Sequence, residues 1–136
     1  MDIPGPATTF GFNQALGLVV TEVGPDRVVA TLEVTPAHHQ PFGLVHGGVW
    51  CAAIETVTSI GAAAWWGDRG HIVGVSNHTD FIRGVREGAT TTVATPIHQG
   101  RSQQLWLAEV RDDRDRLVAR GQVRIQNLES SDGLGR

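Results

Sequence analysis

The sequence contains one cysteine, Cys51, in 136 residues. A single cysteine excludes an intrachain disulfide and is typical of a protein that works in a reducing compartment. An excess of positive charge is also missing, because the formal net charge is -3. A negative chain has no net electrostatic attraction to nucleic acid or to an anionic membrane surface. We therefore expect neither nucleic acid nor membrane among its partners.

The amino terminus lacks the basic region and apolar run of a signal peptide. No repeat, low-complexity run or change of composition indicates a second domain. With 40% hydrophobic and 18% charged residues, the chain has the composition of a globular protein and the length to bury a core. The sequence thus predicts one cytoplasmic domain over residues 1–136, ending in a disordered tail at 128–136.

The most apolar stretch runs from Val49 to Trp66 and has Glu55 as its one charged residue. Its length is close to the roughly 20 apolar residues of a membrane span. Glu55 near the middle and the lack of a flanking basic cluster argue against insertion. A helix that is apolar or small on nearly every side is expected to be buried by protein. Because a buried carboxylate is costly without a role, Glu55 is the first catalytic candidate.

Strand patterns surround this helix. We expect helical turns at residues 10–16, and a strand pair at 18–23 and 27–35 joined by a Gly-Pro-Asp turn. Pro96 indicates an edge position or a bulge in a later strand. Long antiparallel strands twist and curl, and the helix is the apolar element available to lie inside. The sequence predicts an α+β fold, a sheet wrapped around one central helix, with four later strands at 71–83, 89–98, 102–111 and 117–126.

The turn before the helix reads Gln-Pro-Phe-Gly-Leu-Val-His-Gly-Gly over residues 40–48, and six residues separate Gly48 from Glu55. A glutamine, then HGG opening a buried helix, then an acid on that helix resembles the hotdog-fold acyl-CoA thioesterases of the phenylacetate and 4-hydroxybenzoyl-CoA type. The resemblance covers residues 10–127 and includes Gly-Arg-Ser-Gln at 100–103. It implies a hotdog fold and hydrolysis of an acyl-CoA without metal or redox cofactor.

Two positions refine the resemblance. Many relatives carry aspartate where this chain has Glu55, and the glutamate points to the hydroxybenzoyl-like and proofreading-like branch. Some members of that branch also carry histidine late in the strand after the helix, where this chain has Phe81 and Ile82.

Thioester hydrolysis needs a polarised carbonyl, and the helix start can supply the donor. The first N–H groups of a helix lack internal partners, and glycine lets a ligand approach them closely. We expect the Gly47 N–H, together with Gly48, to contact the thioester oxygen. Gln40 and His46 would add polar contacts or orient the loop. The alternative is that the two glycines only form a turn.

Glu55 is expected to act as general base or as nucleophile, and the sequence does not choose between them. Ser59 lies one turn further on the same helix face, where it either positions the water or the carboxylate, or bonds back to its own helix. Glu55 lies eight residues beyond Gly47, about 12 Å along the axis. That is too far for one thioester carbon to lie roughly 3 Å from both groups.

Two antiparallel helices across a twofold axis remove this problem, because Gly47 of one chain then meets Glu55 of the other. We therefore predict a homodimer with shared active sites, which is also what the resemblance implies, and expect a dimer of dimers. Further substrate-binding candidates are Asn77 and His78 on the strand after the helix, which line the acyl or pantetheine slot or else an exposed sheet face. Arg83 and Arg101 are expected to meet the CoA phosphates, and Ser102 is a further substrate-binding candidate.

Asp80 is the second candidate acid. His38, His39 and His46 lack a neighbouring carboxylate or cysteine cluster, so we expect no metal site. Two other functions fit a hotdog fold: a hydratase or dehydratase that uses a His–acid pair, and a non-catalytic module that binds an acyl carrier.

Overall fold

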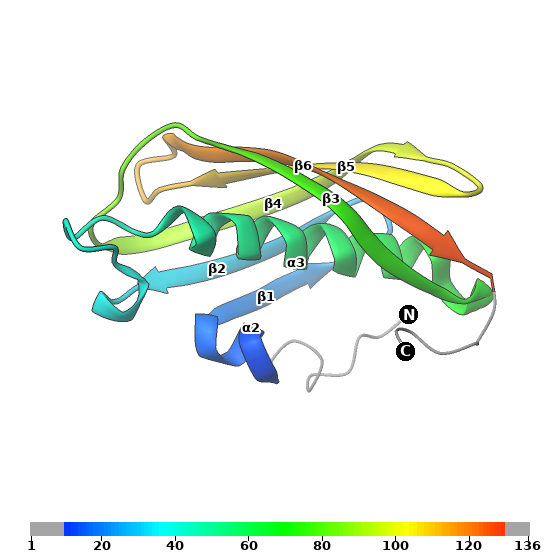
Figure 1. Cartoon of the computed structure of the whole chain (residues 1–136), viewed down its shortest axis with the longest axis horizontal. Helices are drawn as coiled ribbons and strands as arrows, with labels where there is room; N and C mark the ends of the chain where they lie inside the picture. The colour runs from blue at the N-terminus through cyan, green and yellow to red at the C-terminus, as the bar shows by residue number, and fades with distance from the viewer. Residues whose placement is uncertain (1–9, 130–136) are drawn as a thin grey trace.

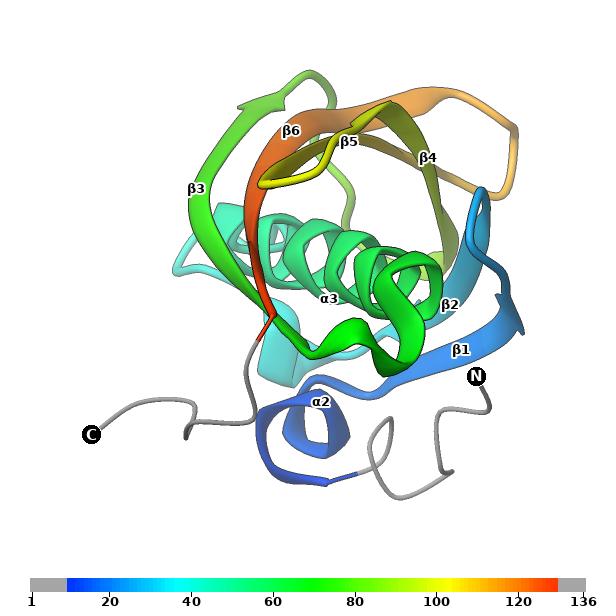
Figure 2. The same cartoon turned by 90° about the vertical axis from the view of Figure 1, so that its right-hand side faces the viewer.

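The structure is a computed structural model that describes residues 10–129. Within this range, an antiparallel sheet of six strands curls around one long helix, α3 (Gly47–Trp66) (Figures 1 and 2). The strand order is β1-β2-β4-β5-β6-β3, so β1 and β3 form the two edges. The predicted α+β fold with a central helix is confirmed.

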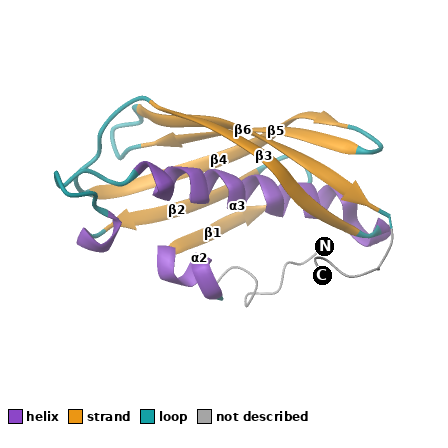
Figure 3. Cartoon of the chain, in the orientation of Figure 1, coloured by secondary structure: helices purple, strands orange, loops and turns teal. Residues whose placement is uncertain are grey.

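The elements follow the expected sequence along the chain (Figure 3). The strands are β1 (Leu18–Val23), β2 (Val28–Val34), β3 (His71–Phe81), β4 (Gly88–Gln99), β5 (Gln103–Arg111) and β6 (Leu117–Leu128). The short helices are α2 (Gly11–Leu16) and the 3-10 turns η1 (Pro36–His38) and η2 (Gly67–Arg69). The prediction of a disordered tail from residue 128 onward is wrong at Leu128. This residue pairs with His71 and is the last residue of β6. Residues 130–136 lie outside the described range.

Alternation along each strand produces the inner face of the sheet. In β2, Val28, Ala30 and Leu32 point inward and are buried. Pro96 lies at a register shift in the pairing of β4 with β5, as predicted for a bulge. The pairing of β4 with β2 ends at Ala94, so the missing N–H of Pro96 interrupts no bond to β2.

One side of α3 forms the centre of the core. Ala53, Ile54 and Val57 are fully buried, and Trp106 of β5 lies against the helix at Gly61. Burying a side chain such as Ile54 or Val57 contributes about 1.5–3 kcal/mol each. Packing on this side therefore fixes which side of α3 faces away from the sheet.

The C-terminal end of α3 is closed by an arginine. Gly67 ends the helix with φ 65°, and Arg69 donates from Nε to the Trp66 carbonyl (2.9 Å) and from Nη2 to the Trp65 carbonyl (2.8 Å). The guanidinium also lies 4.5 and 4.2 Å from the centroids of the two indole rings. A cation here complements the negative end of the helix dipole.

The opposite side of α3 contradicts the expectation of burial on nearly every side. An open stripe, which we define as Gly48, Cys51, Ala52, Glu55 and Ser59, is exposed or half-buried. The single sheet covers the inner side of the helix and leaves this stripe to solvent. Glu55 is therefore exposed in the isolated chain, and a dry environment around it requires a further covering surface. Within residues 10–129, no helix has the length and hydropathy to cross a membrane.

Candidate active site

His46 is the N-cap residue of α3. Its Nδ1 accepts a hydrogen bond from the Gly48 N–H (2.8 Å), and its carbonyl accepts one from the Val49 N–H (2.9 Å). Among residues 10–129, the Gly47 N–H has no acceptor. Because a helix N-terminus carries partial positive charge, this N–H is a free donor at a position that favours an anion or a carbonyl oxygen. His46 thus orients the helix start, as expected, and occupies the Gly48 N–H that was proposed as a second donor.

Gln40 lies in a tight loop just before the helix. Its backbone N–H donates to the Leu44 carbonyl (2.7 Å), and its carbonyl accepts from the Gly43 N–H (3.0 Å). The side-chain Oε1 accepts from the Phe42 N–H. This fixes the amide oxygen and leaves the NH2 group of Gln40 without an acceptor among the described residues. Gln40 is therefore held in place as a donor.

Gln40 and Gly47 line the same cavity of about 280 Å³, together with Arg83 and the ring of Phe81. We call it the Arg83 cavity. It joins three of the residues singled out in the sequence, and Arg83 is its one charged wall. The arrangement provides two hydrogen-bond donors and a cation within one recess.

Glu55 and Ser59 both lie on the open stripe, one turn apart, as predicted from their spacing. Neither side chain makes a hydrogen bond or ion pair within residues 10–129. The hydroxyls of Thr56 and Thr58 do bond back to the helix, at the carbonyls of Ala52 and Ile54 (both 2.8 Å). The hydroxyl of Ser59 is free to contact a ligand or the Glu55 carboxylate.

Two candidates on β3 have other partners. The Asn77 side chain donates to the Cys51 carbonyl (3.0 Å) and accepts from the Thr79 hydroxyl (2.7 Å), which fastens β3 to α3. His78 points to the outer face of the sheet, where its Nε2 lies 3.7 Å from an Asp80 oxygen. His78 and Asp80 are exposed and lie away from the Arg83 cavity. Alternation of side chains on a strand separates Asn77 from His78, so His78 and the alternative acid Asp80 are not at this site.

Arg101 and Ser102 lie in the β4–β5 turn, which sits at the C-terminal end of α3, away from Gly47 (Figure 1). Asn127 holds this turn: its Nδ2 donates to the Gly100 carbonyl (2.9 Å) and its N–H to the Ser102 carbonyl (2.9 Å). Within one chain, the structure therefore does not bring Arg101 and Ser102 to Gly47.

The three loop histidines serve separate roles. The His38 Nδ1 accepts from the Thr35 N–H (2.9 Å), and its Nε2–H donates to the Leu16 carbonyl (2.6 Å). The His39 Nε2–H donates to the Arg86 carbonyl (2.7 Å). Within residues 10–129, no three His, Cys, Asp or Glu side chains are grouped as metal ligands.

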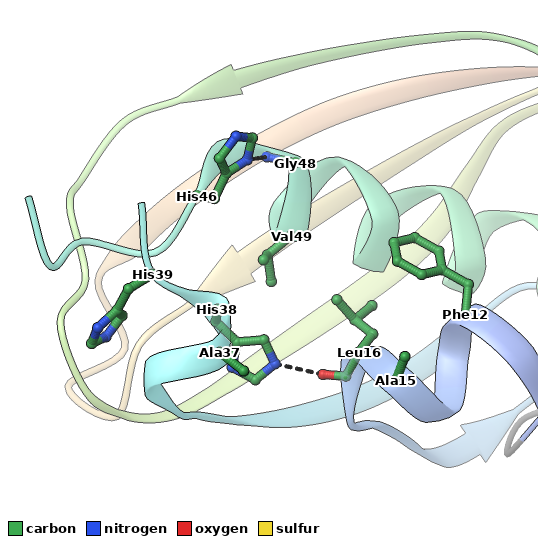
Figure 4. Close-up of a pocket in the computed structure, with 9 residues that line it drawn as sticks. All are labelled: Phe12, Ala15, Leu16, Ala37, His38, His39, His46, Gly48 and Val49. Atoms are coloured by element: carbon green, nitrogen blue, oxygen red, sulfur yellow. Dashed lines mark hydrogen bonds between the residues drawn. The ribbon is translucent and has the colours of Figure 1, made fainter. Parts of the chain in front are cut away.

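A second cavity, of about 370 Å³, was not predicted from the sequence. It lies between α2 and the start of α3, and Phe12, Leu16, His38 and Val49 are among its walls (Figure 4). We call it the α2 cavity. The signal was present in the spacing of Phe12, Ala15 and Leu16, which places them on one face of a short helix.

Comparison with known proteins identifies the family. Residues 42–119, which include Gly47 and Glu55, match the thioesterase superfamily. The chain belongs to the thioesterase superfamily. It is a thioester hydrolase of the hotdog fold. This membership disfavours the two alternative functions, a hydratase or dehydratase and a non-catalytic binding module.

Relatives in the superfamily cover most of the chain. A Mycobacterium tuberculosis protein, Rv1847, named for a proposed esterase activity, is 51% identical over 133 residues, 95% of both chains. Its solved structure has a TM-score of 0.86 at 52% identity and covers 88% of this chain and 97% of its own. The Listeria monocytogenes 1,4-dihydroxy-2-naphthoyl-CoA hydrolase is 32% identical over 79% of this chain and 88% of its own length. The Haemophilus influenzae thioesterase HI1161 structure has a TM-score of 0.84 at 29% identity, covering 93% and 90%.

Proposed function

We propose that this thioesterase hydrolyses acyl-CoA thioesters with an aryl or medium-chain acyl group. The observation that carries the proposal is the pair of free donors, the Gly47 N–H and the Gln40 NH2, in one cavity at the positive end of α3. A thioester carbonyl oxygen is the acceptor that both donors fit. One preorganised donor of this kind contributes roughly 10²–10³ in rate.

Glu55 acts on the carbonyl carbon that these donors polarise. As general base it removes a proton from water while the water oxygen attacks, and as nucleophile it attacks directly and water then releases it. In both routes the C–S bond breaks, the sulfur takes up a proton, and one water is consumed. The products are the free acid and the CoA thiol.

The carboxylate comes from a second copy of the chain. Eight residues of helix rise separate Gly47 from Glu55 by about 12 Å, more than a glutamate side chain spans. The open stripe is lined by small residues, so another helix can approach it closely. The free edge of β3 offers unpaired backbone groups on the same side. These features support a homodimer in which Glu55 of the partner subunit faces Gly47, and two such dimers would form a tetramer.

The CoA portion would follow the positive side chains. Arg83 lies in the same cavity as Gly47 and Gln40, so it would meet the phosphates of the bound CoA. An antiparallel pair of helices also moves the C-terminal end of each α3 toward the N-terminal end of the other. Arg101 and Ser102, on the β4–β5 turn, would then serve the site of the partner chain. The CoA hydrolase named among the relatives supports CoA as the carrier. The single cysteine supports a cytoplasmic setting.

Release of free thiol from a panel of acyl-CoAs tests the proposal. We expect turnover by the wild type and a fall of about 10²–10⁴ in kcat for Glu55→Gln and Glu55→Ala. The affinity for CoA should stay within about threefold, because the carboxylate contacts the reacting atoms only. Wild-type protein that releases no thiol, or Glu55→Ala that releases it equally fast, would falsify the assignment.

A further inference from the structure

Two cavities flank the N-terminal end of α3, and their walls differ in chemistry. The Arg83 cavity has an arginine, an amide and the Gly47 N–H. The α2 cavity has no arginine, aspartate or glutamate among its described walls, which include Phe12, Ala15 and Leu16 of α2. The two recesses meet α3 at neighbouring residues, since Gly47 lines the first and Gly48 and Val49 line the second.

Three histidines, His38, His39 and His46, also line the α2 cavity, and four of their six ring nitrogens are hydrogen-bonded within the described residues. Both ring nitrogens of His38 are hydrogen-bonded, to the Thr35 N–H and the Leu16 carbonyl. The Nδ1 of His46 is held by the Gly48 N–H. Figure 4 shows Val49 pointing from α3 toward Leu16 and His38, with the Phe12 ring turned toward α3. The space that remains is bounded mainly by hydrocarbon, so it suits an apolar group.

A thioester held at Gly47 must send two arms in different directions. Its carbonyl carbon is planar, and when the oxygen faces the donors, the acyl carbon and the sulfur point to opposite sides. The sulfur arm carries the amides and phosphates of CoA, which fit the cavity with Arg83. The acyl arm is then left with the α2 cavity.

We propose that the α2 cavity is the acyl pocket and that Phe12 and Ala15 set the size of the acyl group accepted. This inference rests on the proposed function, because it places the carbonyl at Gly47. The volume of about 370 Å³ lies at the lower end of the roughly 300–1,000 Å³ of small-molecule sites. The pocket therefore has room for an apolar acyl group of the size of hexanoyl or benzoyl.

Ala15 offers a clean way to fill this pocket. Its side chain is exposed and lines the cavity, so a larger residue enters the recess without disturbing the buried core. Gln14 is the matched control, because it is exposed on the same helix and does not line the cavity. Ala15→Phe and Gln14→Phe therefore add the same ring to α2 in two positions. Phe12→Ala makes the opposite change and enlarges the pocket.

The experiment compares kcat/KM for acetyl-, hexanoyl-, benzoyl- and dodecanoyl-CoA. We expect Ala15→Phe to lower the hexanoyl/acetyl and benzoyl/acetyl ratios by at least about 10-fold, in the range that pocket fit gives. Gln14→Phe should keep the wild-type ratios, and Phe12→Ala should shift preference toward dodecanoyl-CoA. Unchanged ratios in Ala15→Phe with an active wild type would overturn the pocket assignment while the hydrolase function stands.

Binding gives a second readout that does not need turnover. In a Glu55→Gln background, the Kd of hexanoyl-CoA should rise at least about 10-fold when Ala15→Phe is added, whereas the Kd of free CoA should not change. Equal losses for both ligands would place the effect on the CoA arm and contradict the acyl pocket. A wild type that binds hexanoyl-CoA but hydrolyses none of the panel would contradict the proposed function. The binding comparison would then decide alone whether the α2 cavity holds the acyl group.

Discussion

The ring of Phe81 covers Gly47 so closely that a Cβ atom on residue 47 would lie 2.5 Å from two of its carbons. The contact joins the end of β3 to the start of α3, and it explains in steric terms why residue 47 is glycine. It also places an apolar ring against residue 47, in the cavity that Gly47 lines. A donor with restricted access to water interacts more strongly with a developing negative charge.

This contact predicts that Gly47→Ala is destabilising because of Phe81. We expect a loss of about 1–3 kcal/mol in the free energy of unfolding, the usual cost of overpacking. Adding Phe81→Ala should recover at least about 1 kcal/mol, since neighbouring residues couple. Urea unfolding of the two single variants and the double variant measures the coupling. Strictly additive losses would show that the ring is not the obstacle.

A mixed dimer tests whether each site is shared. Pairing a Glu55→Gln chain with a Gln40→Ala chain leaves one site with both native groups and one site with neither. We expect about half of the wild-type kcat, well above either homodimer, which should each fall by roughly 10² or more. Differently tagged chains purified in tandem provide the sample. If each site belonged to one chain, both sites would be impaired and the mixture would show no recovery.

Packing of α3 against the sheet predicts that a second glycine, Gly61, cannot be replaced by alanine without loss of stability. A Cβ atom on Gly61 would lie 2.5 Å from the Trp106 ring, whereas one on Gly74 meets no atom within 4 Å. In an open helix, alanine for glycine would stabilise by up to about 1 kcal/mol. Here we expect Gly61→Ala to lower the free energy of unfolding by about 1–3 kcal/mol instead. Gly74→Ala should change it by less than about 0.5 kcal/mol.

The charged hairpin between β5 and β6 predicts a pH effect on stability. Burial raises the pKa of Asp112, but the N–H groups of Arg116 and Arg114 and the Arg116 guanidinium outweigh it, so the pKa lies below the usual 3.8. A carboxyl group whose pKa is lower in the folded than in the unfolded chain stabilises the fold at pH values above the unfolded pKa. This contribution is lost as the pH falls through the lower pKa of the folded chain. The advantage of wild type over Asp112→Asn in urea unfolding should therefore shrink from pH 7 to pH 3.

Local patterns were sufficient for the helix and strands and for placing Gly47 at the start of α3. Alternation in β2, the Gly-Pro-Asp turn and the HGG helix start are signals between neighbours in the chain, and they predicted the strands and the free donor at Gly47. The face occupied by Glu55 was misjudged, because a helix apolar on all sides does not reveal which side the sheet leaves open. That side is decided by the curl of six strands, a property of the whole fold.

Long-range contacts account for what the sequence did not reveal. Phe81 meets Gly47 across 34 positions of sequence, and His38 meets the Leu16 carbonyl across 22. Gln104 donates to the Asn127 side chain (2.8 Å) and accepts from the Trp106 indole (2.8 Å) inside the core. Such pairs depend on strand order and register, and no periodicity in a single segment encodes them.

The open stripe and the free edge of β3 have a thermodynamic consequence. In the proposed dimer, the second copy covers Glu55 and the free edge of β3, so part of the native free energy comes from the interface. Dilution should therefore act on this protein as a denaturant does, lowering the melting temperature and the specific activity over the same concentration range. The dissociation constant of the dimer would then be a limit on both stability and catalysis.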